Sequence, residues 1–238
     1  MIAKTFILNE NITFVEKKCI KSWLKNNYKV EIYSFYKINF PNTTYKNANK
    51  ICNIEDIIKI KDIYIKKLYF ILKLVYKIGG LVFFPDVFSN NYYNFTDNLV
   101  STQPKPDYNS QFKDFNIIYF RKGHKYLEKI MNHFWYFYND YKDGYNKNII
   151  ETLNLIDKEM YEEDWNFFNN CNNLHWKSQI GINFNTEKFK SLKGKNIKIR
   201  TDICKENYFI KIFQDEIYNY LNTNENISKE CLLHKILR

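Results

Sequence analysis

The stretch 62–88 restricts the fold of this 238-residue chain more than any other part of its sequence. Apolar residues recur at spacings of three and four along its first half, which predicts an amphipathic helix. Gly79-Gly80 follows, and glycine is the residue that most often ends a helix at a positive φ. The four apolar residues 81–84 then predict a short buried strand. The segment therefore predicts a helix, a glycine turn and a buried strand that ends just before Asp86.

Asp86 is the first candidate for chemistry. In an open α/β sheet, ligands collect at the carboxyl ends of the strands, so a carboxylate just after a buried strand is well placed to bind a metal or a substrate. The alternative is a structural one, in which an acidic residue after Pro85 stabilises a turn. Both interpretations remain open from the residues alone.

Residues 74–88 resemble the signature of DXD-type glycosyltransferases related to capsular-polysaccharide and mannosyl transferases. The signature is a leucine-rich helix that runs through a tyrosine into Gly-Gly, then an apolar strand, then Asp-x-Asp. The matching residues, in order and spacing, are Leu74, Tyr76, Gly79, Gly80 and Asp86. The resemblance implies a GT-A fold in which the two acids hold the nucleotide end of a sugar donor. It also implies that Asp86, which corresponds to the last acid, binds Mn²⁺ or Mg²⁺ that bridges the diphosphate.

The chain departs from this signature at three positions. Phe84 stands in place of the first acid, while Leu68 and Ile71 stand in place of an acid and an arginine of the preceding helix. A single carboxylate still suffices for magnesium or manganese, because these cations keep several waters and take one or two protein carboxylates beside substrate phosphates.

The first 35 residues predict a strand, a helix and a second strand. Residues 5–9 form a short apolar strand, Thr13 and Glu16 have the spacing of a capping box at a helix start, and residues 30–35 form the next strand. Such a unit is right-handed and parallel, so we expect the nucleotide above the end of its first strand. With the resemblance, this gives a predicted nucleotide-sugar site made of Leu8, Asn9, Gly79, Gly80 and Asp86. The Ser22-Trp23 pair near the end of the first helix is also similar to that family.

The second half of the chain is less informative. A polar connection with a short helical piece at 53–58 leads into the central helix. Residues 89–114 contain Pro104 and Pro106 and predict a long loop. A strand at 115–120 and a helix from His124 follow, and His124 and His133 are interpreted as surface histidines of that helix.

From residue 148 onward we expect mainly helix, with short strands at 176–184, 196–200 and 208–213 and a terminal helix at 228–237. Asp164 is a weak catalytic candidate. The preferred interpretation is that the acids 162–164 complement a helix dipole.

Composition narrows the class of protein. A content of 45% hydrophobic residues supports one folded domain, 1–238, with a nucleotide-binding half at 1–90 and an acceptor-side half at 115–238. The net charge of +10 comes from scattered lysines and not from a block, so no nucleic-acid partner is expected. Five cysteines without C-x-x-C spacing, no leader and no apolar run of membrane-spanning length predict a cytoplasmic protein with no transmembrane segment.

These observations together predict an α/β protein of GT-A-like fold, with a single mixed sheet flanked by helices. The leading hypothesis is a glycosyltransferase that moves a sugar from a nucleotide-diphosphate donor to a glycan or another acceptor, assisted by a metal. The alternative is a transferase-like protein that has lost catalysis and kept a nucleotide or glycan site. A basic nucleic-acid-binding protein is a third hypothesis, without a motif to support it.

Overall fold

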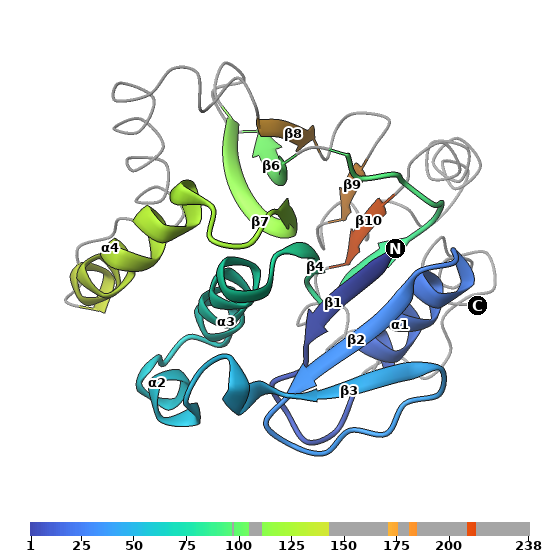
Figure 1. Ribbon diagram of the computed structural model, residues 1–238, viewed down its shortest axis with the longest axis horizontal. Helices are drawn as coiled ribbons and strands as arrows, with labels where there is room; N and C mark the ends of the chain where they lie inside the picture. Colours follow the sequence, from blue (N-terminus) through green and yellow to red (C-terminus); the bar gives the residue numbers. More distant parts are fainter. Residues whose placement is uncertain (97, 105–110, 143–170, 176–180, 185–208, 213–238) are drawn as a thin grey trace.

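A seven-stranded mixed sheet forms the centre of the molecule (Figure 1). The computed structural model describes residues 1–96, 98–104, 111–142, 171–175, 181–184 and 209–212. In spatial order the strands are β3 (Thr43–Asn47), β2 (Lys29–Ser34), β1 (Ile2–Phe6), β4 (Gly80–Phe83), β7 (Gln111–Phe120), β6 (Asn98–Pro104) and β8 (Cys171–His175). The first four strands are parallel, β7 runs antiparallel to both β4 and β6, and β8 is parallel to β6. The predicted mixed α/β architecture is confirmed.

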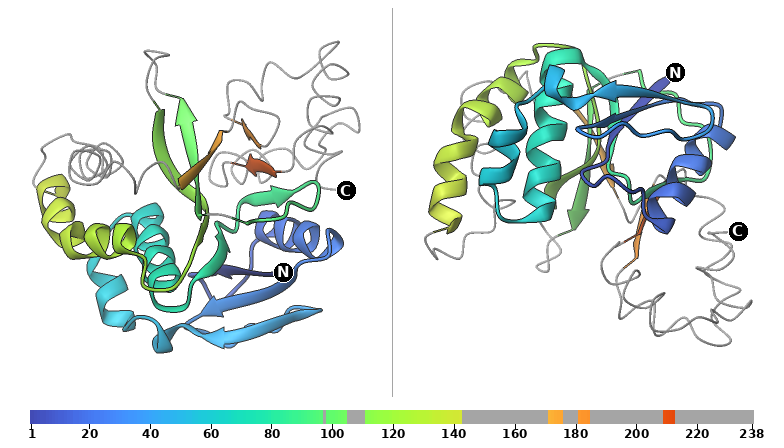
Figure 2. Two further views of the ribbon diagram at one scale, coloured as in Figure 1. Left: turned by 45° about the horizontal axis from the view of Figure 1, so that its top comes forward. Right: turned by 90° about the horizontal axis from the view of Figure 1, so that it is seen from below.

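Helices cover both faces of this sheet. They are α1 (Phe14–Lys25), α2 (Ile54–Lys59), α3 (Ile63–Ile78) and α4 (Lys125–Lys142), with one 3₁₀ turn at Ala48–Lys50. Trp23 of α1 stacks on Phe83 at 4.1 Å between ring centroids, while Tyr64 of α3 stacks on Phe84 at 5.3 Å. Because consecutive strand residues point to opposite faces, α1 and α3 lie on opposite sides of β4. Figure 2 shows the same arrangement, with α3 and α4 on one side and α1 on the other.

The start of α1 is determined locally. The Thr13 hydroxyl accepts a hydrogen bond from the Glu16 amide, and the Glu16 carboxylate accepts one from the Thr13 amide at 2.9 Å. This is the predicted capping box, which satisfies two amides that the first helical turn leaves without partners. The helix ends at Lys25, with Asn26 as its C-cap.

Helix α3 begins at Asp62, whose carboxylate accepts a hydrogen bond from the Ile65 amide at 2.9 Å. Helix α3 packs against the sheet on one side and against α4 on another. Phe70 stacks on Phe6 of β1 at 3.9 Å, and Tyr69 contacts Phe134 of α4 at 4.5 Å. The sequence predicted one buried and one hydrated face, and α4 covers part of the face that was expected to be hydrated.

A second, three-stranded sheet continues from the strand after Asp86. Its order is β5 (Val87–Ser89), β10 (Phe209–Ile212) and β9 (Gly181–Phe184), with β5 and β10 antiparallel. The sequence predicted short strands close to β9 and β10, but it did not predict this sheet beside the main one.

Two predictions about local structure are wrong. The expected loop at 89–114 contains the end of β5, the strand β6 and the first residues of β7. The connection after β2 contains β3, which pairs in parallel with β2 from Val30 with Thr43 to Ser34 with Asn47. Both missed strands are rich in polar residues, and pairing with a neighbour supplies the stability that their own composition does not indicate.

Several predicted elements lie outside the described residues. These are most of the expected helical stretch after residue 148, including Asp164, the strand at 196–200 and the terminal helix at 228–237.

Candidate functional site

The candidate site lies at the carboxyl ends of β1 and β4. The two strands are parallel, with Ala3 paired to Leu81 and Lys4 to Val82. Past these pairs the chain after β4 turns, since the Val87 amide donates to the Phe84 carbonyl at 3.0 Å. Leu8 and Asp86 are partly exposed and Asn9 is exposed. Three of the five residues predicted from the sequence therefore follow the carboxyl ends of these two strands, at the edge where open α/β sheets bind ligands.

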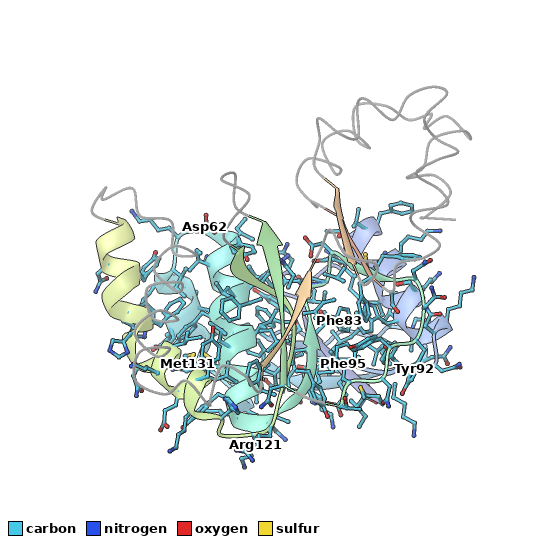
Figure 3. The ribbon with its side chains drawn as sticks, turned by 90° about the horizontal axis from the view of Figure 1, so that it is seen from above. Asp62, Phe83, Tyr92, Phe95, Arg121 and Met131 are labelled. Carbon is cyan, nitrogen blue, oxygen red and sulfur yellow. The ribbon has the colours of Figure 1, made fainter. Side chains whose placement is uncertain are left out.

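Gly79 and Gly80 lie at the other end of β4, because the strand runs from Gly80 to Phe83 and Asp86 follows it. Figure 3 shows Asp62 and Arg121 at opposite ends of α3, with the glycine turn at the Arg121 end. A Cβ atom on Gly79 would lie 2.5 Å from the backbone nitrogen of Lys122. The structure thus separates the two glycines from Asp86, and the close backbone approach accounts for Gly79.

The segment that follows Asp86 is fixed to α1 by hydrogen bonds. The indole Nε1 of Trp23 donates to the Val87 carbonyl at 2.8 Å, and the Ser89 amide donates to the Ser22 hydroxyl at 2.8 Å. The amide group of Asn26 donates to the Ser89 carbonyl at 2.8 Å. Two side chains of α1 and that of its C-cap, Asn26, therefore hold β5, and with it the backbone immediately after Asp86.

The three positions where the chain departs from the DXD signature belong to the core. Phe84 is 2% exposed and stacks on Tyr64, and Leu68 and Ile71 are fully buried. Apolar side chains fill this part of the edge, so Phe84 does not act as a polar contact for a ligand.

A buried ion pair at this edge was not predicted from the sequence. The ammonium of Lys67 lies 3.4 Å from Oε1 of Glu16, and the two side chains are 10% and 3% exposed. Sequence reasoning used Glu16 only as a capping residue and did not consider Lys67. The residues are 51 positions apart, so no local pattern could have paired them.

Electrostatics link this pair to Asp86. Burial raises the pKa of the Cys19 thiol well above its usual range, and the negative charges of Asp86 and Glu16 raise it further. Both carboxylates therefore raise the pKa of the same thiol in α1. Cys19 stays protonated and is not a nucleophile, because thiol reactivity requires the thiolate.

The two histidines of the α4 region differ. His133 is exposed, as predicted, and its Nδ1 donates to the Lys129 carbonyl at 2.8 Å. The prediction of a surface position is wrong for His124, which is 7% exposed and lies with Nε2 3.1 Å from Nδ2 of Asn98. Burial, with the charge of Arg121, lowers the pKa of His124 to about 4.

Metal-binding groups are sparse in the part of the chain that the structure describes. No three residues among His, Cys, Asp and Glu gather there in a way that could hold an ion. A divalent cation at Asp86 would therefore take at most two ligands of these kinds from the described residues. No helix in the described ranges combines the length and apolar character needed to cross a bilayer.

Comparisons with known proteins support the fold. No family model and no curated protein matches the sequence. Among the solved structures that match is one titled "PaToxG Glycosyltransferase", with a TM-score of 0.50 and 14% identity over 71% of this chain and 72% of that chain. At that identity the likeness shows a shared glycosyltransferase-like fold, and the chemistry of this chain must be argued from its own residues.

Proposed function

We propose that this protein is a glycosyltransferase that transfers a sugar from a nucleotide-diphosphate donor to a glycan or another acceptor. The observation that carries the proposal is the position of Asp86. It is a partly exposed acidic residue that follows the carboxyl end of β4, a strand parallel to β1. The glycosyltransferase-like fold supports the same reaction class at the level of fold.

The residues at this edge fit a weakly held magnesium or manganese ion. Asp86 provides one carboxylate oxygen donor, and the donor's phosphates and water would complete the coordination. The site does not fit zinc, which prefers three or four nitrogen or sulfur ligands from the protein. When bound, the ion would offset negative charge on the diphosphate leaving group.

The chain's own residues supply the geometry of the site. Trp23 and Ser22 hold the backbone at Val87 and Ser89, so the Asp86 carboxylate keeps a fixed place relative to the end of β1. Helix α1 starts at this edge, and the partial positive charge of its N-terminus favours an anionic ligand there. Cleavage of the sugar–phosphate bond develops negative charge on the diphosphate, so a preorganised positive environment stabilises the transition state.

The second candidate function is a transferase-like protein that binds a nucleotide or glycan without catalysis. The observation that favours it is the burial of Phe84, Leu68 and Ile71, since these core positions leave the edge with fewer polar contacts.

The buried, unbridged thiols of Cys19 and Cys52 support a reducing compartment, and we include the cytoplasm in the proposal.

The test of binding is a thermal-shift screen of nucleotide sugars with and without manganese. A ligand that binds the native state raises the melting temperature, by an amount set by its concentration relative to Kd. Asp86→Asn should abolish the manganese-dependent shift. Asp62→Asn is the matched control, because it makes the same change at the same edge and asparagine also caps helices well. Equal shifts in the parent and Asp86→Asn would overturn the assignment of Asp86.

A second experiment separates enzyme from binding protein. Water can replace the acceptor in many transferases, so a folded enzyme should slowly hydrolyse at least one nucleotide sugar in the presence of manganese. Release of free sugar that stops on chelation supports the transferase. Tight binding with no turnover, in the presence of a panel of glycan acceptors, supports the binding protein.

A further inference from the structure

The side chains of Glu16 and Lys67 meet over the carboxyl edge of the sheet. Glu16 belongs to α1 and Lys67 to α3, and these helices pack on opposite faces of β4. A contact of 3.4 Å between their side chains must therefore pass beyond the ends of the strands. The Lys67 ammonium consequently lies at the edge that also carries Asp86.

The carboxylate of Glu16 is held in a fixed orientation. Its Oε2 accepts hydrogen bonds from the amide and the hydroxyl of Thr13, at 2.9 and 3.0 Å. Its Oε1 is directed to Lys67. The capping box of α1 thus holds the carboxylate that pairs with the ammonium of a helix on the other face.

Stability alone does not explain this pair. Removing two charges from water costs several kcal/mol per ion, and an apolar pair of similar volume often serves a fold equally well. Lys4, another buried lysine in the described part of the chain, has a structural explanation. Its ammonium donates to the Gly79 carbonyl at 2.9 Å, where it meets the end of α3. Lys67 instead pairs with Glu16 beyond the ends of the strands.

We propose that Lys67 is a donor-binding residue whose ammonium, paired with Glu16 in the empty site, interacts with the diphosphate of the nucleotide sugar. This inference rests on the proposed function. A lysine ammonium is a point charge well suited to phosphate oxygens. Since Asp86 is the one carboxylate expected to hold a cation, a fixed ammonium supplies positive charge to the leaving group that does not depend on metal.

Removal of the Lys67 ammonium and removal of the Glu16 charge should change nucleotide affinity in opposite directions. Glu16 offsets the charge of Lys67 when the site is empty, so removal of the carboxylate charge leaves the edge more positive. Glu16→Gln keeps the capping box, because glutamine also suits that position. A pair with a purely structural role would lose stability and affinity together in both variants.

The experiment is calorimetric titration of UDP, GDP, ADP and dTDP into the parent protein and four variants, with manganese and with EDTA. Lys67→Met should weaken binding of the preferred nucleotide about tenfold or more in both conditions. Lys67→Arg should stay within about threefold of the parent, because the charge is retained. Glu16→Gln should bind equally or more tightly. Lys77→Met is the matched control, since it removes a lysine that donates to the Ile51 carbonyl at 2.8 Å near the other end of α3.

The possible results test the role of Lys67 and the proposed function separately. Weaker binding by Lys67→Met alone, with melting temperatures that show every variant folded, supports the role of Lys67. Equal binding by the parent and Lys67→Met overturns that role and leaves the proposed function standing. Parallel losses in Lys67→Met and Glu16→Gln also overturn it, because they indicate a structural pair. No binding of any nucleotide to the folded parent overturns both.

Discussion

The indole Nε1 of Trp23 donates a hydrogen bond to the carbonyl of Val87, at 2.8 Å, and so ties α1 to the residue after Asp86. The same ring lies between Phe83 and Phe209, with centroid distances of 4.1 and 5.2 Å. One side chain therefore contacts β4 and two strands of the small sheet, β5 and β10. This makes Trp23 a positioning residue for the candidate site, although it does not reach the edge itself.

We expect Trp23→Phe to retain ring stacking and to lose the hydrogen bond. The Val87 carbonyl would then remain buried without this donor, at a cost of about 1–3 kcal/mol in the free energy of unfolding. Urea unfolding measures this change, and thermal shift with nucleotide sugars should show reduced affinity because Asp86 adjoins the freed segment. Tyr138→Phe is the control, since its hydroxyl accepts from the Lys61 amide at 2.7 Å and donates to the Lys59 carbonyl, and neither bond involves the segment after Asp86. If both variants lose stability and bind donor equally well, Trp23 does not position the site.

Gly79 and Gly123 form a matched pair for testing the turn at the end of α3. Both have positive φ, at 75° and 67°, but a Cβ on Gly79 would lie 2.5 Å from the Lys122 nitrogen, whereas nothing lies within 4 Å of one on Gly123. Gly79 has ψ of −178°, in a region that essentially only glycine adopts, so its conformation is not the left-handed helical one.

Gly123→Ala should cost about 1 kcal/mol, the usual strain of a positive φ, and Gly79→Ala clearly more, about 2–4 kcal/mol. Chemical denaturation of the two variants beside the parent gives the comparison. Similar losses would show that the backbone at Lys122 moves away readily.

The sequence predicted the parts of this structure that local interactions determine. The capping box of Thr13 and Glu16 and the glycine at the end of α3 each act within a few residues, so their chemistry was visible in the chain. The prediction of Asp86 as a site residue also came from a local pattern, an acid after a short apolar run.

The missed features depend on distant partners. β6 is stabilised by pairing with β7 and β8, which its polar composition and Pro104 did not indicate. In the sequence, nothing distinguishes Lys67 from the other lysines of its helix. Its ion pair with Glu16 is visible only in the structure, where α1 and α3 approach each other at the sheet edge. The two glycines were grouped with Asp86 because they are close in sequence, although a strand separates them in space.

Thr5 offers a test of a buried hydroxyl. Its side chain is fully buried in β1, and its Oγ1 makes no hydrogen bond within the described residues. Thr5→Val keeps the shape and removes the hydroxyl, so we expect the free energy of unfolding to rise by about 1 kcal/mol. Thr43→Val should lower the free energy of unfolding by a similar amount, because the Thr43 hydroxyl donates to the Phe40 carbonyl at 2.8 Å. A clear loss of stability in Thr5→Val would reveal a partner for this hydroxyl from the remainder of the chain.

His124 should make the stability of the protein depend on pH. Its pKa is lowered to about 4 in the folded state, from the usual histidine value of 6.5, chiefly by burial. The unfolded chain therefore binds a proton more readily, and the free energy of unfolding falls as pH drops below about 6.5. At pH 5 the loss relative to neutral pH amounts to as much as about 2 kcal/mol from this group. Guanidinium unfolding of the parent and His124→Gln at pH 7.5 and pH 5 isolates the effect, since glutamine does not titrate. The parent should lose more stability than the variant between the two pH values, and parallel losses would show that His124 titrates normally in the folded protein.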